Sequence, residues 1–184
     1  INGKYKPLSE SFISITDRGF QFSDGVYEVI AIYNDKFVDE LLHLNRLRIS
    51  LNKLNIKINL SVKQIQNISY KIKKLNKISN GIIYIQVTRG DQHPRDHKYG
   101  KSLKSNIVIY SIQKDFKKLD QLALKGVKAS LYPDIRWLRS DIKSISLLGN
   151  VMAANHAKKN NSHEAILFDH KNNITEGNSS SIWI

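Results

Sequence analysis

Apolar side chains recur along this chain with two different periods, and the alternation of these periods most constrains its fold. Residues 26–33, Val-Tyr-Glu-Val-Ile-Ala-Ile-Tyr, form a mostly apolar run that predicts a β-strand. Asn34-Asp35 predicts a turn, after which residues 36–38 return as a second strand. Asp39 is placed to cap a helix whose leucines recur at helical spacing, namely Leu41, Leu44, Leu47, Leu51 and Leu54.

A second helix and two further strands continue this alternation. Ser61 followed by Gln64 is the signature of a capping box, in which each side chain bonds the other residue's backbone N–H. An apolar face follows it, made of Val62, Ile65, Ile68, Ile72 and Leu75. Residues 81–89 and 107–112 predict strands on either side of a polar loop, 90–105. Segments that alternate in this way indicate an α/β fold.

The chain divides near residues 113–122 into two parts. Residues 113–124 are charged and lack a clear apolar period, which is typical of a linker or an exposed helix. Beyond them, residues 125–132 predict a strand, and residues 164–169 and 174 onward predict short strands joined by a turn at 171–173. A helix is expected between them, with an apolar face of Leu147, Leu148, Val151, Met152 and Ala154. We therefore expect domains over 1–112 and 123–184 with an interdomain linker at 113–122.

Composition excludes several classes of protein. The chain of 184 residues has 41% hydrophobic and 24% charged residues, which are ordinary globular values, and no cysteine that could form a disulfide or bind a metal. It has no run of 18 apolar residues and no secretory signal, so we expect no membrane partner, and the lack of cysteine is compatible with the cytoplasmic location that we expect. The net charge of +13 suggests nucleic acid, but the lysines are dispersed among Asn and Ile, as A/T-rich codons would produce. We expect no nucleic-acid partner.

One lysine and one glutamate stand out in the second part. Lys143 lies between the polar, partly cationic residues 134–142 and the apolar residues 145–148, and Glu176 lies in the hydroxyl-rich turn Thr175-Glu-Gly-Asn-Ser-Ser-Ser181. A lysine that attacks a carbonyl, together with a carboxylate for a ring nitrogen, is what a pyridoxal 5'-phosphate site requires. From spacing alone this signal is weak, because a Lys and a Glu some 33 residues apart occur in most proteins.

Several motifs resemble those of D-amino-acid transaminases, in the family's order. They are Asp17-Arg-Gly-Phe-Gln-Phe-Ser-Asp-Gly-Val-Tyr-Glu28, His43-Leu-Asn-Arg-Leu47, Tyr84-Ile-Gln-Val-Thr-Arg-Gly90, Pro94-Arg-Asp-His97 and Ser140-Asp-Ile-Lys-Ser144. These enzymes belong to the fold type IV group of pyridoxal phosphate enzymes. The resemblance implies an N-terminal α/β sandwich and the start of a C-terminal, cofactor-binding α/β pseudo-barrel. Relatives continue beyond Ile184, so we expect a chain that is truncated at its C-terminus; its start at Ile1, without Met, suggests a missing N-terminus too.

The resemblance assigns the cofactor-binding residues. Lys143 matches the lysine that bonds the cofactor, and Glu176 matches the glutamate that faces the pyridine nitrogen. Arg46 matches the arginine that binds the phosphate, a role that suits the two-pronged guanidinium. Ser179 and Ser180 match small hydroxyl residues near the cofactor. The chain departs from the family at Asn178 and Ser181, where serine and asparagine are usual.

The resemblance also assigns the substrate-binding residues. Tyr27, Arg95 and His97 match a trap for the substrate carboxylate, to which one subunit supplies the tyrosine and the loop of the other supplies the two cations. A homodimer is therefore expected. His93 and His97 have the spacing of metal ligands on a helix, but Gly90 and Pro94 argue against a helix, so we expect no metal site.

The expected reaction is transamination between a D-amino acid and a 2-oxo acid. D-Alanine and 2-oxoglutarate are the expected pair, and pyruvate and D-glutamate the products. A branched-chain aminotransferase or an aminodeoxychorismate lyase of the same fold is the alternative, and the Arg95–His97 loop distinguishes it. An inactive fragment or a basic binding module is a further alternative, which cofactor binding would distinguish.

Overall fold

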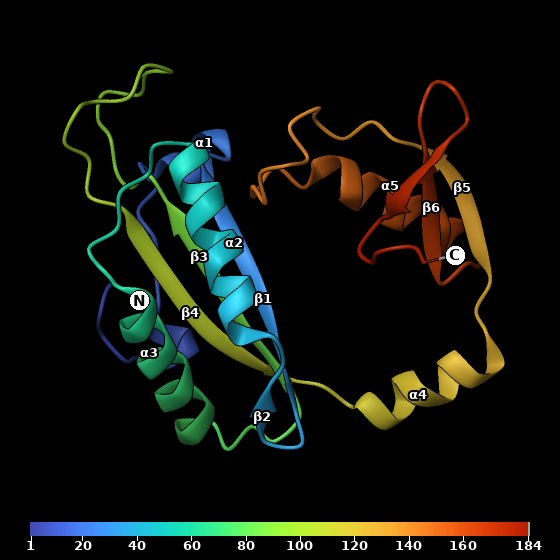
Figure 1. Cartoon of the computed structure of the whole chain (residues 1–184). Helices are drawn as coiled ribbons and strands as arrows, with labels where there is room; N and C mark the ends of the chain where they lie inside the picture. The colour runs from blue at the N-terminus through green and yellow to red at the C-terminus, as the bar shows by residue number, and fades with distance from the viewer. Residues whose placement is uncertain (184) are drawn as a thin grey trace. The chain divides into compact units, whose positions relative to one another are not determined.

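The computed structural model describes residues 1–183, and the chain forms two compact units (Figure 1). The first unit contains Ile1–Phe116 and Asp141–Ile145, and the second contains Lys117–Ser140 and Ser146–Ile184. A short segment around residue 143 thus belongs with the N-terminal unit, although most of its neighbours in sequence do not. Over residues 1–183, no helix has both the length and the apolar character needed to cross a membrane.

The first unit is built on an antiparallel four-stranded sheet with the order β2-β1-β3-β4. Its strands are β1 (Gly25–Tyr33), β2 (Lys36–Phe37), β3 (Gly81–Thr88) and β4 (Asn106–Gln113). The predicted strands 26–33, 81–89 and 107–112 are therefore confirmed. Two short helices, η1 (Leu8–Glu10) and α1 (Arg18–Phe22), precede the sheet.

Two helices, α2 (Glu40–Lys53) and α3 (Val62–Leu75), cover one face of this sheet (Figure 1). Side chains of β1 and β3 at alternate positions meet the helices in the core, which includes Ile30, Ile83, Leu44, Leu47 and Ile65. The predicted capping box of Ser61 and Gln64 is present, with both reciprocal hydrogen bonds.

The predicted cap at Asp39 is wrong. Asp39 has a φ of 48° and its side chain makes no capping hydrogen bond. The residue adopts this left-handed conformation where the chain leaves β2, whereas a capping side chain requires an extended backbone. In α2 and α3, two predicted face residues are also more exposed than expected, Leu41 at 57% and Leu75 at 59%. The face predicted for the helix over Leu148–Lys159 is wrong as well: Leu148, Val151 and Met152 are exposed, and Ala153 and Ala157 are buried instead.

The second unit holds a three-stranded sheet with the order β5-β6-β7. Its elements are α4 (Phe116–Lys125), β5 (Ala129–Pro133), α5 (Leu148–Lys159), β6 (Glu164–Phe168) and β7 (Ile174–Gly177). Strand β5 is parallel to β6, and the connection between them contains α5. Ala153 and Ala157 of α5 pack on Ala165 and Leu167 of β6, because small side chains allow the helix to approach the sheet closely.

The helix α4 begins where the chain passes from the first unit to the second. Residues 113–124 were expected to be a linker or an exposed helix, and α4 contains no buried residue. The strand predicted over 125–132 begins only at Ala129, since α4 continues to Lys125. The strand predicted from residue 174 onward ends at Gly177, and Ile184 lies outside the described residues. The domain limits 1–112 and 123–184 stay a prediction.

Residues 141–145 join the first unit through both backbone and side-chain contacts. Strand β2 pairs only with the C-terminal end of β1, so the other end of this edge is open. There the N–H of Tyr27 donates to the carbonyl oxygen of Lys143 at 3.0 Å, and the N–H of Ile145 donates to that of Gly25 at 3.1 Å. The side chain of Ile142 enters the core and is 4% exposed. Burial of such a side chain contributes about 1.5–3 kcal/mol, which anchors the segment.

We predict that Ile142→Ala in the full-length protein lowers the free energy of unfolding by about 2–4 kcal/mol, because it removes buried methyl groups and leaves a cavity. Ile49→Ala is the matched control, since Ile49 is 53% exposed on α2, and it should change stability by less than about 0.5 kcal/mol. Urea unfolding measures both. Equal effects of the two substitutions would contradict the anchoring role of Ile142.

Candidate active site

Lys143 lies beside Tyr27 in the first unit. Val26 and Glu28 of β1 are buried, so the side chain of Tyr27 between them points to the opposite face of the sheet, and Lys143 meets it there. The Nζ atom of Lys143 is 3.4 Å from the hydroxyl oxygen of Tyr27 and 4.4 Å from the centre of its ring. The Lys143 N–H donates to the hydroxyl of Ser50, a buried residue of α2. A half-buried amine is thus held beside a phenol by a rigid backbone.

Tyr27 belongs to a row of three tyrosines across the sheet face. Its ring stacks on that of Tyr84 with centres 5.8 Å apart, and Tyr84 contacts Tyr110 at 5.1 Å. Burial, together with the neighbouring Tyr110 and Tyr27, raises the pKa of Tyr84 to about 12. Tyr84 therefore keeps its proton at neutral pH and donates it to Oε1 of Gln86 at 2.8 Å. Tyr84 and Tyr110 thus extend the aromatic surface beside Tyr27.

Arg46 is held by a carboxylate inside the core. Glu28 alternates with Val26 and Ile30 on the buried face of β1, and its side chain is 0% exposed. The Nε of Arg46 donates to Glu28 at 2.5 Å, its Nη2 donates at 3.0 Å, and Nδ1 of His43 lies 2.8 Å from the same carboxylate. The Arg46 side chain is nevertheless 53% exposed. Glu28 thus fixes the guanidinium in one orientation while part of it faces outward.

Arg95 and His97 lie together on the loop between β3 and β4. Both pack on Phe22, with the Arg95 guanidinium 4.2 Å from the ring centre and the His97 ring at 5.1 Å. The buried Arg18 binds the loop backbone, because its guanidinium donates to the carbonyl oxygens of Asp96 and His97. This loop therefore has a defined shape, with the side chains of Arg95 and His97 on the same ring.

Glu176 belongs to a charged network in the second unit. It accepts a hydrogen bond from Nη1 of Arg136, whose Nε and Nη2 donate to Asp134 at 2.9 and 2.8 Å. The hydroxyl of Thr175 donates to Asp134 at 2.7 Å. These bonds to Asp134 and Glu176 raise the pKa of Arg136, against the effect of burial. The charge of Arg136 is thus balanced by two carboxylates.

Ser179 and Ser180 share a second carboxylate, that of Glu164. Both hydroxyls and the Ser179 N–H donate to it at 2.7–3.2 Å. Burial opposes ionisation of Glu164, but these hydrogen bonds lower its pKa below the ordinary value. The neighbouring Asn178 is buried, and its Oδ1 accepts from the N–H of Ala165 at 2.7 Å. The departure from the family at Asn178 therefore attaches the turn to β6.

The predicted residues thus fall into two sets. Tyr27, Arg46, Arg95, His97 and Lys143 belong to the first unit, and Glu176, Ser179 and Ser180 belong to the second. Sequence reasoning missed the carboxylates that hold these side chains, Glu28, Asp134 and Glu164. Glu28 carried a signal, because it is a single charge at an inward position of an apolar strand. The other two had no signal in the sequence.

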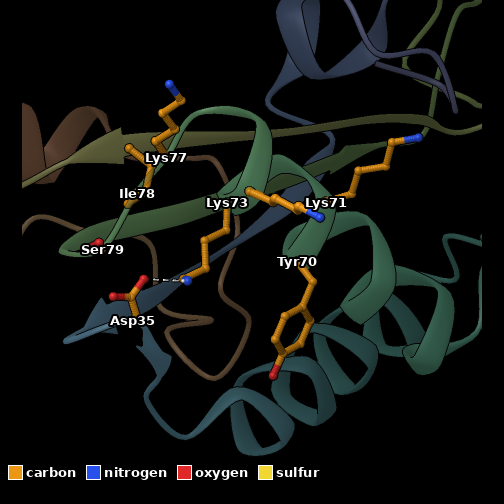
Figure 2. A pocket seen from close by; sticks show the side chains of 8 residues that line it. Asp35, Tyr70, Lys71, Lys73, Lys77, Ile78 and Ser79 are labelled. Carbon is orange, nitrogen blue, oxygen red and sulfur yellow. Dashed lines mark hydrogen bonds and ion pairs between the residues drawn. The ribbon is translucent and has the colours of Figure 1, made fainter.

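A hollow of about 580 Å³ lies elsewhere in the first unit, and no predicted site residue lines it. Its lining includes four lysines, but the side chains do not converge: Figure 2 shows Lys73 directed at Asp35, at 2.9 Å, and Lys77 directed away from it. The hollow therefore lacks the arrangement of an anion site. Within residues 1–183, no group of three or more His, Cys, Asp or Glu side chains is placed to hold a metal ion.

The chain belongs to the amino-transferase class IV family, whose sequence model matches residues 25–184. D-Alanine aminotransferase of Listeria monocytogenes serotype 1/2a (strain 10403S) is 36% identical over 184 residues, which are 100% of this chain and 63% of that protein. D-Alanine aminotransferase of Staphylococcus aureus (strain MSSA476) is 40% identical over 185 residues, which cover 100% of this chain and 64% of that protein. The expected resemblance is confirmed. The chain spans less than two thirds of the length of these curated relatives.

Solved structures confirm fold type IV. The branched-chain amino acid aminotransferase of Escherichia coli matches with a TM-score of 0.84 and 16% identity, over 96% of this chain and 61% of that chain. A hypothetical aminotransferase from Mycobacterium tuberculosis, in a PLP-bound form, matches with a TM-score of 0.79 and 15% identity, over 96% of this chain and 63% of that chain. At these identities the likeness concerns the fold.

The Asp134–Arg136 pair predicts a pH dependence of stability. The hydrogen bonds from Arg136 lower the pKa of Asp134 from 3.8 to about 2, despite partial burial. The folded state therefore favours the ionised carboxylate, and this contribution is full above pH 3.8 and is lost as the pH falls towards 2. After allowance for screening by water, it amounts to about 1–2 kcal/mol at neutral pH.

We expect Asp134→Asn in the full-length protein to be destabilised by about this amount at pH 7, and the difference from wild type to shrink between pH 4 and pH 2. Denaturant unfolding across this range measures it. Asp120→Asn, at an exposed position of α4, is the control and should follow wild type throughout. A constant difference at every pH would contradict the ion pair's contribution.

Proposed function

We propose that the full-length protein catalyses reversible transfer of an amino group between a D-amino acid and a 2-oxo acid, with pyridoxal 5'-phosphate as cofactor. The amino donor is D-alanine and the acceptor is 2-oxoglutarate, so that pyruvate and D-glutamate are formed. The observation that carries this proposal is the amine of Lys143, which a core-anchored segment holds 3.4 Å from the Tyr27 hydroxyl. Relatives named D-alanine aminotransferase, at 36–40% identity, support the choice of a D-amino acid over the branched-chain alternative.

The chemistry of the side chains fits this cofactor, which has an aldehyde, a phosphate and a pyridine nitrogen. Lys143 would bond the aldehyde carbon, and Arg46 would bind phosphate oxygens with the exposed part of its guanidinium. Glu176, which is 42% exposed, would face the ring nitrogen. Ser179 and Ser180 would lie near the cofactor. When bound, the cofactor supplies an electron sink for the pair left on the substrate's α-carbon.

Lys143 would then act as the proton carrier. Its amine would take the α-proton from the substrate and return a proton to the product. The Tyr27 hydroxyl and ring hold Nζ in place, since both lie within 4.4 Å of it. The backbone bonds between residues 143–145 and β1 limit the range of positions that the amine can reach.

Tyr27, Arg95 and His97 would bind the substrate carboxylate. A hydroxyl and two cationic donors suit an anion, and charge-assisted hydrogen bonds of this kind are stronger than neutral ones. In our proposal the protein is a homodimer, in which the loop with Arg95 and His97 serves the partner's site. Because Arg95 and His97 share one ring, Phe22, a displacement of this loop would move both donors together.

The assignment of Lys143 is tested by borohydride reduction of the full-length protein. Wild type should bind pyridoxal phosphate, lose its yellow colour on reduction, and carry a pyridoxyl group on a peptide that contains Lys143. Lys143→Ala should lose this covalent label, because the only amine assigned to the cofactor is gone. Lys57→Ala, which removes an exposed lysine, is the control and should be labelled like wild type. Full labelling of Lys143→Ala would rule out the proposed role.

The use of a partner's loop is tested by mixing two inactive variants. Arg95→Ala and Lys143→Ala subunits are unfolded together and refolded, so that mixed dimers form. If the loop crosses between subunits, one site of each mixed dimer has both residues intact, and statistical mixing should restore about a quarter of wild-type activity with D-alanine. If each site uses its own loop, no site is intact and the mixture stays inactive.

A further inference from the structure

We propose that Arg18 is a positioning residue for substrate recognition: it fixes the backbone of the loop that carries Arg95 and His97, and thereby sets the affinity for the substrate carboxylate. This inference rests on the proposed function, which assigns carboxylate binding to that loop. The argument for it comes from the hydrogen bonds, burial and charge around Arg18.

Arg18 uses its guanidinium to bind backbone rather than a substrate. Its side chain is 4% exposed, and it lies in α1, beneath the loop. Nη1 donates to the carbonyl oxygen of Asp96 at 2.6 Å, and Nη2 donates to that of His97 at 2.9 Å. These two peptide groups follow Arg95 directly in sequence. Two parallel bonds to consecutive carbonyls fix both the position and the orientation of the peptide between the two proposed donors.

A buried carboxylate and a second arginine keep Arg18 in place. Asp24 accepts from Nε of Arg18 at 2.8 Å and from Nε of Arg89 at 2.7 Å, both on the same oxygen. Arg89 in turn donates to the carbonyl oxygens of Leu54 and Asn55, at the end of α2. Burial opposes ionisation of Asp24, but the bonds and charges of Arg89 and Arg18 lower its pKa below the ordinary value. The cluster is therefore charged at neutral pH and connects the loop to α2.

Aromatic rings complete the contact with the loop. The Arg18 guanidinium lies 4.7 Å from the ring centre of Phe22, and the same ring carries Arg95 at 4.2 Å. Arg89 lies 3.7 Å from the ring centre of Tyr99, which belongs to the loop. The side chains of Arg95 and His97 thus contact the Phe22 ring, while Arg18 binds the backbone carbonyl oxygens of Asp96 and His97. A lysine at position 18 could not make the same set of bonds, because an ammonium lacks the planar fork.

The experiment compares Arg18→Lys with Arg89→Lys in the full-length holoenzyme. Arg89→Lys also removes a buried guanidinium from Asp24, but it leaves the two bonds from Arg18 to the loop and keeps a cation over Tyr99. The substrates are D-alanine and D-alaninol, which has the same skeleton without the carboxylate. Single-turnover rates give the apparent affinity and the maximal rate for each.

We expect Arg18→Lys to raise the apparent KM for D-alanine about tenfold, the effect of weakening one charge-assisted hydrogen bond. Its maximal rate and its reaction with D-alaninol should stay within about threefold of wild type, because neither depends on carboxylate binding. Arg89→Lys should reduce the thermal stability but leave the ratio of D-alanine to D-alaninol affinity unchanged. Equal changes in this ratio for both variants, or none for Arg18→Lys, would overturn the inference.

Hydrogen exchange separates failure of this inference from failure of the proposed function. Arg18→Lys should speed exchange at the loop amides of Gln92, Lys98 and Gly100, which are bonded in wild type, while the amides of β1 and β3 keep their protection. If wild type does not react with D-alanine, the proposed function fails, and exchange alone still decides whether Arg18 holds the loop. Unchanged exchange in these amides would show that it does not.

If Arg18→Lys does not fold, Phe22→Leu provides a second test. It removes the ring shared by Arg95 and His97 but keeps an apolar side chain. We expect a selective loss of D-alanine affinity relative to D-alaninol, in the same direction as for Arg18→Lys. Retention of the wild-type ratio would contradict the claim that the held position of this loop governs carboxylate binding.

Discussion

The pairing of residues 143–145 with the open edge of β1 is the contact on which the candidate site depends. A lysine on a free loop would sample many positions, and its amine would meet Tyr27 only briefly. Here two backbone hydrogen bonds align the segment with the strand, and Ile142 enters the core of the first unit. The chain turns at Lys143, where the N–H of Ser144 donates to the carbonyl oxygen of Ile142 at 2.8 Å, so that Lys143 contacts Tyr27 while Ile142 lies in the core. The residue that anchors the segment in the core, Ile142, is therefore the immediate neighbour of the proposed cofactor lysine.

Charged groups in both units follow a common arrangement. Four of the side chains proposed for the site are held by charged partners: Glu28 binds Arg46, Arg136 binds Glu176, and Glu164 binds Ser179 and Ser180. Burial makes an unpaired charge costly, so these partners are satisfied in a single geometry. These contacts fix the orientation of the four side chains before any ligand binds. Because these side chains are already ordered, less side-chain conformational entropy would be lost when a ligand binds.

The fold was largely predictable from sequence because most of its elements follow from local patterns. Mostly apolar runs identified β1 and β3, the helical spacing of leucines identified α2, and Ser61 with Gln64 identified the start of α3. The failures were local as well. Asp39 is a residue type that often caps helices, but the tight exit from β2 requires a left-handed backbone there. Residues 125–128 have no apolar period that separates the end of α4 from the start of β5.

By itself, the sequence determined the type and order of most elements and, through family motifs, the residues to examine, since both are written in neighbouring positions. Only the tertiary structure decided which side chains form ion pairs and hydrogen bonds with one another. Glu28 with Arg46 and Asp24 with Arg89 are separated by many residues, and Lys143 reaches Tyr27 across 116 positions. Pattern and propensity act over one or two turns of chain, whereas ion pairs and buried hydrogen bonds depend on distance in space, which only the packed sheet and helices establish.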